Sequence, residues 1–297
     1  MIRTLFATAR PPFLVLAPLC VLVALAYASH KEYSYDLVSV VLCFIAAVLA
    51  HASVNMLNEY QDFKSNLDTN TQRTPFSGGS GALPINPKAA NAVKWTGYLL
   101  AVIVFCIGLF FVIKVSWVLI PLGLLGLACV LFYTPLINRM PILCLIAPGI
   151  GFGLVMVVGS FFVMTGSFDD QLLIYSIPVF CLVNNLLLLN QYPDVEADKQ
   201  AGRKHFIIFY GEENGKWMYL LQWIIATYTC FLILTLNDLP NWSYLLLVLM
   251  SLGLFCFKGL SKYLKHRDIR KLIPFMGINV IISLAYPLLM SVILYVD

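Results

Sequence analysis

Nine long apolar stretches, separated by short polar segments, set the pattern of this chain. They cover residues 12–29, 37–60, 92–112, 116–133, 142–164, 171–192, 216–236, 242–259 and 273–295. Most approach the length of about 20 apolar residues that an α-helix needs to cross a bilayer. They do not alternate between apolar and polar positions, as the strands of a membrane barrel would. The pattern therefore predicts an all-α polytopic membrane protein with nine transmembrane helices.

The composition agrees with a membrane protein and excludes a soluble one. Of the 297 residues, 60% are hydrophobic and 11% are charged, and the mean hydropathy is +0.85. A soluble domain carries about 25% charged residues. The apolar surplus must face lipid, so we expect one membrane domain over residues 1–297, with the bilayer as a partner. No run of five or six like charges indicates a nucleic-acid-binding tail.

The basic residues predict the orientation of the helices. With the N-terminus in the cytoplasm, seventeen of the nineteen Lys and Arg residues fall on the cytoplasmic side, and only Lys31 and Lys114 fall on the other. Such a bias is the positive-inside rule, and it favours an N-in, C-out arrangement. We expect an integral protein of the cytoplasmic (inner) membrane. Two polar segments on its cytoplasmic side, 61–91 and 193–215, hold the candidate chemistry.

The second apolar stretch carries a polar stripe. His51, Asn55, Asn58 and Asp62 are spaced 4, 3 and 4 residues apart, and Asp68 follows. On a helix this spacing places the first four side chains on one face. Polar groups at membrane depth are costly, so the face should line a bundle interior or a wet cavity. The alternative is that the amides join neighbouring helices and the carboxylates are solvated helix ends.

The sixth apolar stretch repeats the arrangement on the same side of the membrane. Asn184, Gln191, Asp194 and Asp198 are spaced 7, 3 and 4 residues apart, which again predicts one helix face. Two matching stripes favour a shared cavity over interhelical hydrogen bonding alone.

The paired carboxylates Asp62/Asp68 and Asp194/Asp198 suit a hard divalent cation. They would repel one another unless a cation joined them, and Mg2+ takes oxygen ligands that it usually shares with substrate phosphates. No His/Cys spacing typical of zinc competes with this interpretation.

Cations for phosphate oxygens follow each acidic group. They are Arg73, Lys199, Arg203 and Lys204. Arginine suits bidentate phosphate contacts and lysine suits a point contact. Between the acidic groups, residues 76–81 form a glycine-rich segment whose backbone amides could approach a ligand closely. His205 is interpreted as a solvated loop residue.

Two segments resemble the Asp-rich motifs of the UbiA superfamily of membrane prenyltransferases. The first is Asn58-Glu-Tyr-Gln-Asp62-Phe-Lys-Ser-Asn-Leu-Asp68, and the second is Asp194-Val-Glu-Ala-Asp198-Lys-Gln-Ala-Gly202. The resemblance implies nine helices around a central cavity, with the two motifs facing each other. It also implies Mg2+-assisted departure of diphosphate from a polyprenyl diphosphate and alkylation of an aromatic acceptor. By this resemblance, Asn58 and the four Asp residues would hold Mg2+ and the diphosphate, and Arg73 matches the basic residue that usually follows the first motif.

Within the superfamily, the spacing of the first motif is similar to that of the 1,4-dihydroxy-2-naphthoate polyprenyltransferases of menaquinone synthesis. The lead-in Asn190-Gln-Tyr-Pro-Asp194 also resembles that branch. The chain departs from the family pattern at three places. Glu59 stands where aspartate is usual, the run that follows Arg73 differs, and so does Lys204-His205-Phe206 after the second motif. These departures leave other acceptors open: a hydroxybenzoate, homogentisate, a porphyrin-type ring or a glycerol ether lipid. The alternative from another class is a cation-coupled transporter.

Overall fold

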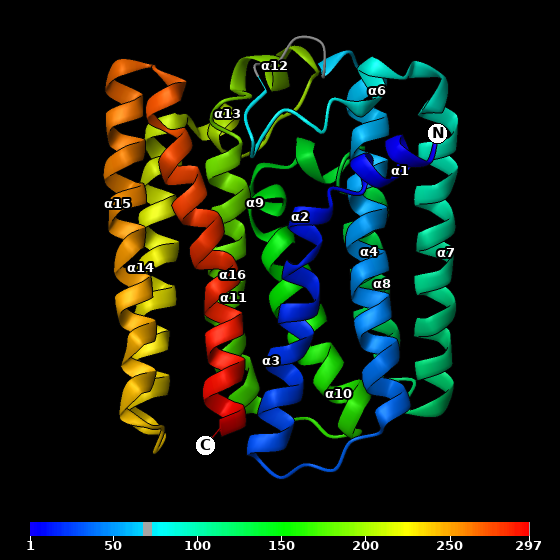
Figure 1. Cartoon of the computed structure of the whole chain (residues 1–297), viewed down its shortest axis with the longest axis vertical. Coiled ribbons are helices and arrows are strands. Elements are labelled where there is room, and N and C mark those ends of the chain that lie inside the picture. Colours follow the sequence, from blue (N-terminus) through cyan, green and yellow to red (C-terminus); the bar gives the residue numbers. More distant parts are fainter. Residues whose placement is uncertain (68–72, 297) are drawn as a thin grey trace.

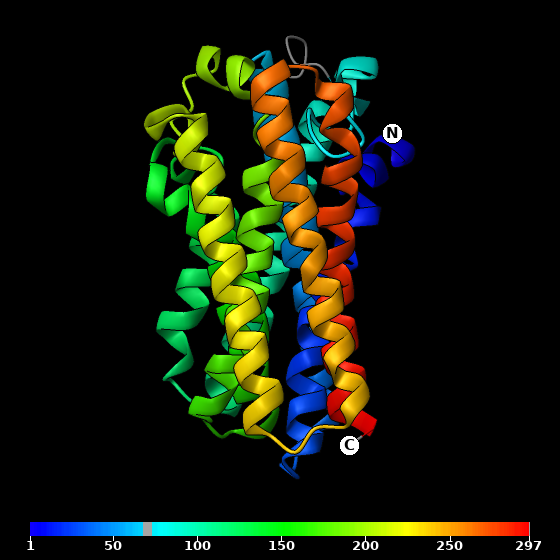
Figure 2. The same cartoon turned by 90° about the vertical axis from the view of Figure 1, so that its left-hand side faces the viewer.

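The computed structural model describes residues 1–67 and 73–296, and this part of the chain is helical, with no strand. The helices stand nearly side by side in a tall bundle, with the N-terminus near its upper end and the C-terminus at its lower end (Figures 1 and 2). The α-helices are α1 (Ile2–Thr8), α2 (Pro11–Leu14), α3 (Leu16–His30), α4 (Leu37–Lys64), α6 (Ala82–Ile85), α7 (Ala90–Lys114), α8 (Leu119–Phe132), α9 (Pro141–Gly149), α10 (Ser160–Thr165), α11 (Asp170–Asn190), α12 (Val195–Gln200), α13 (Phe206–Tyr210), α14 (Glu212–Leu236), α15 (Leu245–His266) and α16 (Ile273–Val296). Short 3-10 turns are η1 (Pro87–Ala89), η2 (Ile137–Arg139), η4 (Asn241–Tyr244) and η5 (Ile269–Lys271), and a π-helix, η3 (Ile150–Gly159), joins α9 to α10.

Eight helical segments in the described part of the chain are long and apolar enough to cross a membrane. They correspond to eight of the nine predicted spans. The stretch predicted at 116–133 forms α8, which has only 14 residues. At about 1.5 Å per residue, α8 is about 21 Å long, short of the ~30 Å hydrocarbon core. A ninth crossing by α8 and the N-in, C-out orientation therefore stay predictions.

The fifth predicted span is one continuous helical column built from three segments, α9, η3 and α10. Its small residues let it pack tightly against α11. A Cβ added at Gly149 would lie 2.7 Å from the ring of Phe180, and one at Gly153 would lie 2.8 Å from Phe180 Cβ. Glycine is therefore needed at both positions, and the backbone of this column lies against α11.

The sixth span ends close to its predicted end at 192, but the polar stripe predicted to continue beyond it is broken. Helix α11 ends at Asn190, and a turn containing Pro193 separates it from α12. Proline has no backbone N–H and restricts the residue before it, so the helix does not continue through it. The prediction that Asn184, Gln191, Asp194 and Asp198 share one helix face is wrong, because they lie on two helices and the turn between them.

The bundle has one large buried core. The large core forms between α3, α11, α14, α15 and α16, where residues such as Tyr175, Tyr219 and Tyr286 are fully buried. Helix α4 packs along α7. The short segments α6, α12 and α13 lie at the upper end of the bundle (Figure 1). The site described next lies beneath these segments.

Candidate active site

A cavity of about 640 Å³ runs down the bundle from its upper end. Polar and charged side chains line its mouth, and mostly apolar side chains and glycines of α4, α7, α8 and η3, phenylalanines among them, line the rest. A cavity of this size with a few convergent polar groups is a typical small-molecule site. Its shape suits an amphiphile with a charged head and an apolar tail.

One wall of the mouth is the polar stripe of α4. His51, Asn55, Asn58 and Asp62 all line the cavity, as their spacing predicts. Asn58 Nδ2 donates a hydrogen bond to Thr134 Oγ1 at 3.1 Å, and Asn55 Nδ2 donates to the carbonyl of Ala9 at 3.0 Å. These bonds fix the stripe against the chain that follows α8 and against the N-terminal segment.

The opposite wall comes from the end of α11 and from α12. Gln191, Asp194 and Asp198 line the cavity from this side. Asp194 Oδ2 accepts a hydrogen bond from the backbone N–H of Gly78 at 3.1 Å. The glycine-rich segment therefore reaches across the mouth of the cavity and contacts the second acidic group.

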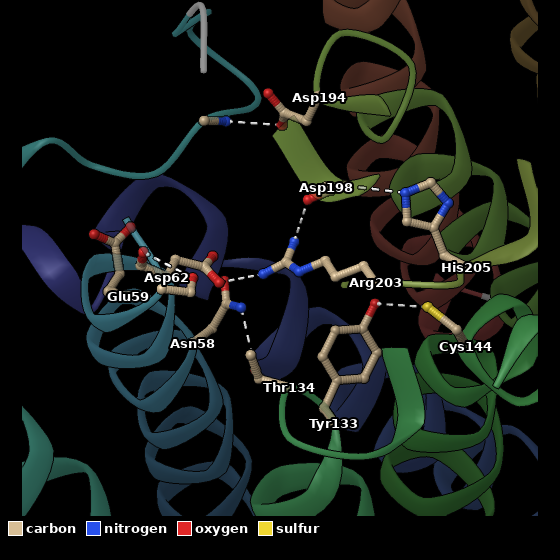
Figure 3. A network of polar contacts seen from close by, with 12 residues as sticks. Asn58, Glu59, Asp62, Tyr133, Thr134, Cys144, Asp194, Asp198, Arg203 and His205 are labelled. Carbon is tan, nitrogen blue, oxygen red and sulfur yellow. Dashed lines mark hydrogen bonds and ion pairs between the residues drawn. The ribbon is translucent and has the colours of Figure 1, made fainter. Parts of the chain in front are cut away.

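Arg203 joins the two walls. Its Nη2 atom donates to Asp62 Oδ1, and its Nη1 atom donates to Asp198 Oδ1 at 2.8 Å (Figure 3). All three side chains are largely buried, with 17%, 10% and 2% of their surfaces exposed for Arg203, Asp62 and Asp198. Burial works against the charge of Arg203, but the two carboxylates outweigh burial and raise the pKa of the guanidinium. The acidic residues of α4 and α12 thus face each other across one shared cation.

The donor set fits a hard divalent cation. The carboxylates of Asp62 and Asp198 converge on a position that a positive charge already occupies, and Asp194 lines the same mouth. Oxygen donors of this kind suit Mg2+ better than zinc. Among the described residues no three His, Cys, Asp or Glu side chains form a closed metal cluster. An open site of two or three carboxylates is what a cation shared with substrate phosphates requires. The predicted ligand Asp68 lies outside the described residues.

The predicted phosphate-binding cations divide into two groups. Arg203 lines the cavity, whereas Arg73, Lys199 and Lys204 are exposed and do not contribute to its lining. Lys199 pairs with Glu196 at 3.1 Å on the surface of α12. Arg73 lies beside Gly81, where an added Cβ would overlap the guanidinium. Their contribution to phosphate binding therefore stays a prediction.

Two residues differ from their predicted surroundings. His205 is 1% exposed rather than solvated, and its Nε2 atom lies 2.9 Å from Asp198 Oδ2. Asn184 does not line the cavity, because its Oδ1 atom accepts a hydrogen bond from the backbone N–H of Gly149 at 2.6 Å between α11 and α9. His51 is buried with its ring against Phe152, and no described residue hydrogen-bonds its Nδ1 atom.

Sequence reasoning missed the residues that join distant segments at the mouth. Tyr133 lines the cavity, and its hydroxyl lies 3.8 Å from Cys144 Sγ. Glu59, 1% exposed, accepts hydrogen bonds from Arg10 Nε at 2.9 Å, from the Ser80 N–H at 2.6 Å and from Ser80 Oγ at 2.8 Å. An acidic residue inside a membrane helix, such as Glu59, indicates that a polar partner lies nearby. Its partners Arg10 and Ser80 are distant in the sequence, so local spacing does not identify them.

Comparison with known proteins agrees with this architecture. The model of the UbiA prenyltransferase family matches residues 15–283. A solved structure described as a UbiA homolog from Archaeoglobus fulgidus bound to DMAPP and Mg2+ superposes with a TM-score of 0.64. The superposition covers 98% of this chain and 99% of that one at 15% sequence identity, so the two share a fold.

Two curated relatives carry the same name, 1,4-dihydroxy-2-naphthoate octaprenyltransferase. The protein from Bacillus subtilis (strain 168) is 29% identical over 193 residues, which cover 64% of this chain and 61% of the relative's length. The protein from Haemophilus influenzae (strain ATCC 51907 / DSM 11121 / KW20 / Rd) is 26% identical over 253 residues, which cover 82% of this chain and 80% of the relative. The chain therefore matches less than two thirds of the Bacillus relative.

Proposed function

Because the chain belongs to the UbiA prenyltransferase family, we propose that it transfers a polyprenyl group from its diphosphate to an aromatic acceptor inside the membrane. The observation that carries the proposal is the pair of opposed carboxylates, Asp62 and Asp198, at the mouth of a long apolar cavity. An anionic head with a metal ion would lie at this mouth, and a hydrocarbon tail would lie below it. We place the mouth on the cytoplasmic side of the inner membrane, in keeping with the distribution of basic residues.

The acceptor we propose is 1,4-dihydroxy-2-naphthoate, which would make this a step of menaquinone synthesis. The names of two relatives that each match more than half of the chain support this choice. In the reaction, the bond between the prenyl C1 and the diphosphate oxygen breaks, and its electron pair leaves with diphosphate. The new carbon–carbon bond forms at the ring carbon that bears the carboxylate. Loss of that group as CO2 returns an electron pair to the ring, so no further reactant is needed.

The diphosphate end of the donor would be bound by both walls of the mouth. Asp62, Asp68, Asp194 and Asp198 would hold Mg2+, whose role would be to neutralise the charge that develops on the departing diphosphate. Asn58 and Arg203 can donate to phosphate oxygens from inside the cavity, and Arg73, Lys199 and Lys204 from its edge. Arg203 is held by two carboxylates before substrate arrives, so its guanidinium is already positioned where negative charge will develop.

The rest of the cavity would protect the reactive prenyl group. Most residues that line the cavity below the mouth are aliphatic or aromatic residues and glycines, which would keep bulk water away from an allylic cation. The glycine-rich segment, bonded to Asp194 through Gly78, covers the mouth. Exclusion of water there would favour transfer over hydrolysis.

The test is prenyl transfer by the purified full chain in nanodiscs. Radiolabelled geranylgeranyl diphosphate would be supplied with 1,4-dihydroxy-2-naphthoate, 4-hydroxybenzoate or homogentisate, with Mg2+ or with EDTA. We expect Mg2+-dependent product with the naphthoate. Product with a different acceptor alone would keep the reaction class and change the substrate. Product formed at the same rate with EDTA as with Mg2+ would contradict the metal-assisted mechanism.

A further inference from the structure

A second, smaller cavity of about 380 Å³ lies beside the mouth of the first. Its walls are the N-terminal segment around Arg10–Phe13 and residues between 74 and 80, which overlap the glycine-rich segment 76–81. The two cavities share lining residues, among them Arg10, Phe13 and Phe76. A ligand in the smaller cavity would therefore lie next to a prenyl donor in the larger one.

The chemistry of the smaller cavity differs from that of the large one. Asp62, Asp194 and Asp198 line the large cavity only, whereas Arg10 is the single charged residue among the described residues that line the small one. Two phenylalanines and three prolines supply flat apolar surface around Arg10. Thr74, Ser77 and Ser80 add hydroxyl groups to the same lining. The site therefore combines apolar ring surfaces with hydroxyls and one cation, which suits a flat hydroxylated ring that bears one anionic group.

Arg10 is held in a way that leaves most of its donors available. Its Nε atom donates to Glu59 at 2.9 Å, and 24% of its side chain is exposed. Within residues 1–67 and 73–296, no side chain or carbonyl accepts a hydrogen bond from Arg10 Nη1 or Nη2. Glu59 accepts this bond and two more from Ser80, so its carboxylate is fixed in place. The planar end of the guanidinium can therefore bind a carboxylate with two parallel N–H donors.

The acceptor's carboxylate is a better match for this site than the donor's diphosphate. A diphosphate carries several charges and needs the metal-binding carboxylates, which lie on the side of Arg203. In Figure 3, Glu59, the partner of Arg10, lies on the side of Asp62 away from Arg203. Arg10 thus flanks the polar stripe of α4 instead of facing the second acidic group.

We propose that this smaller cavity is the acceptor subsite, in which Arg10, oriented by Glu59, binds the carboxylate of an aromatic acid while Phe13 and Phe76 contact its ring. The proposal rests on the proposed function, because it assigns the acceptor side of that reaction. It predicts that the enzyme selects acceptors with a carboxylate and discriminates against the same ring without one.

The test is equilibrium binding without any prenyl donor, so that turnover is not needed. The probes are 1-hydroxy-2-naphthoate and 1-naphthol, followed by fluorescence with the full chain in nanodiscs, against protein-free nanodiscs. Mg2+ with inorganic pyrophosphate is the third probe. The variants are Arg10→Gln, Phe13→Ala and, as a matched loss of an N-terminal arginine, Arg3→Gln on the exposed surface of α1.

We expect Arg10→Gln to weaken binding of the hydroxynaphthoate about ten- to a hundredfold, the effect of losing charge-assisted hydrogen bonds. Binding of 1-naphthol and of pyrophosphate should not change, and Arg3→Gln should bind all three probes as the parent does. Phe13→Ala should weaken both naphthalene probes, which gives a second test if Arg10→Gln fails to fold.

The proposal is overturned if the parent binds both naphthalene probes equally, if Arg10→Gln weakens both alike, or if it weakens pyrophosphate instead. The outcome is separable from that of the proposed function. Arg10-dependent binding of the hydroxynaphthoate without transfer to dihydroxynaphthoate would keep the subsite and reject the assigned reaction.

Discussion

At the scale of single residues, the arrangement around Arg203 explains how three charged groups remain buried together. Asp62 and Asp198 come from different helices and would repel each other without a cation between them. Removing one partner from a buried ion pair costs about 3–5 kcal/mol, because an uncompensated charge remains. Arg203 therefore has a structural role before substrate arrives, in addition to its proposed contact with diphosphate.

Replacing Arg203 should show this structural role directly. We expect Arg203→Gln to lower the midpoint of thermal unfolding in detergent, because Asp62 and Asp198 lose their shared cation. Lys199→Gln is the matched control, since Lys199 pairs with Glu196 at the surface, where an ion pair is worth about 0–1 kcal/mol. Adding Asp62→Asn to Arg203→Gln should recover part of the loss. Equal melting temperatures for both single variants would contradict this account.

The sequence predicted residues that are related by local spacing and missed those related by long-range contacts. His51, Asn55, Asn58 and Asp62 line the cavity because i, i+3 and i+4 positions share a helix face. The bonds of Arg10 to Glu59 and of Arg203 to Asp62 join residues 49 and 141 positions apart. Such pairs depend on how helices pack, which periodicity does not encode.

At the scale of elements, the glycine-rich segment is shaped by a residue that must be glycine. Gly81 has a φ of 72°, and a Cβ at this position would overlap the guanidinium of Arg73. Residues 73–81, which include the glycine-rich segment 76–81 (cyan in Figure 1), cross the upper end of the bundle. The course of this segment therefore depends on both the backbone of Gly81 and the place of Arg73.

Gly81→Ala should weaken binding of the prenyl diphosphate by more than backbone strain alone would. We expect a higher KM for the prenyl diphosphate, because Arg73 and the segment that contacts Asp194 must shift. Gly166→Ala is the matched control: its φ is 69°, it lies in the loop after α10, and nothing lies within 4 Å of the added Cβ. Both changes carry a strain of about 1–2 kcal/mol. A KM that changes equally in both variants would refute a local role for Gly81.

The π-helix η3 offers a test of where the prenyl tail lies. Gly151 lines the cavity, and a Cβ added there meets nothing within 4 Å. Gly151→Phe should fill part of the lower cavity and lower kcat/KM more for geranylgeranyl diphosphate than for geranyl diphosphate. Gly151→Ala should change neither value much. Parallel losses for both donors in Gly151→Phe would indicate that the tail does not pass this point.

The sequence predicted where the membrane helices lie better than it predicted where they end or break. Eight predicted spans match apolar helices because length and hydropathy are local properties. The break at Pro193 was missed because the spacing of Asn184, Gln191, Asp194 and Asp198 predicts one helix through it. The shortness of α8 was missed because 116–133 is almost entirely apolar. A run of apolar residues shows where lipid or core can be, but not where a helix turns within it.

At the scale of the whole molecule, the orientation prediction can be checked across α15. In a background without the eight native cysteines, Lys265→Cys and Asp238→Cys place one thiol at each end of this helix, both at exposed positions. If the basic loops are cytoplasmic, a membrane-impermeant maleimide added outside intact cells should label position 238 and spare position 265. The reverse pattern would invert the topology.

The central claim is that opposed carboxylates at the mouth of the cavity drive Mg2+-assisted departure of diphosphate. The most direct measurement is diphosphate release from radiolabelled geranylgeranyl diphosphate by the purified protein, with acceptor and Mg2+ present, for Asp62→Asn, Asp198→Asn and the exposed lower-end control Asp238→Asn. We predict that the first two lose activity about a hundredfold or more, as expected when groups that stabilise transition-state charge are removed, and that Asp238→Asn matches the parent. Release at the parent's rate by both site variants would contradict the account.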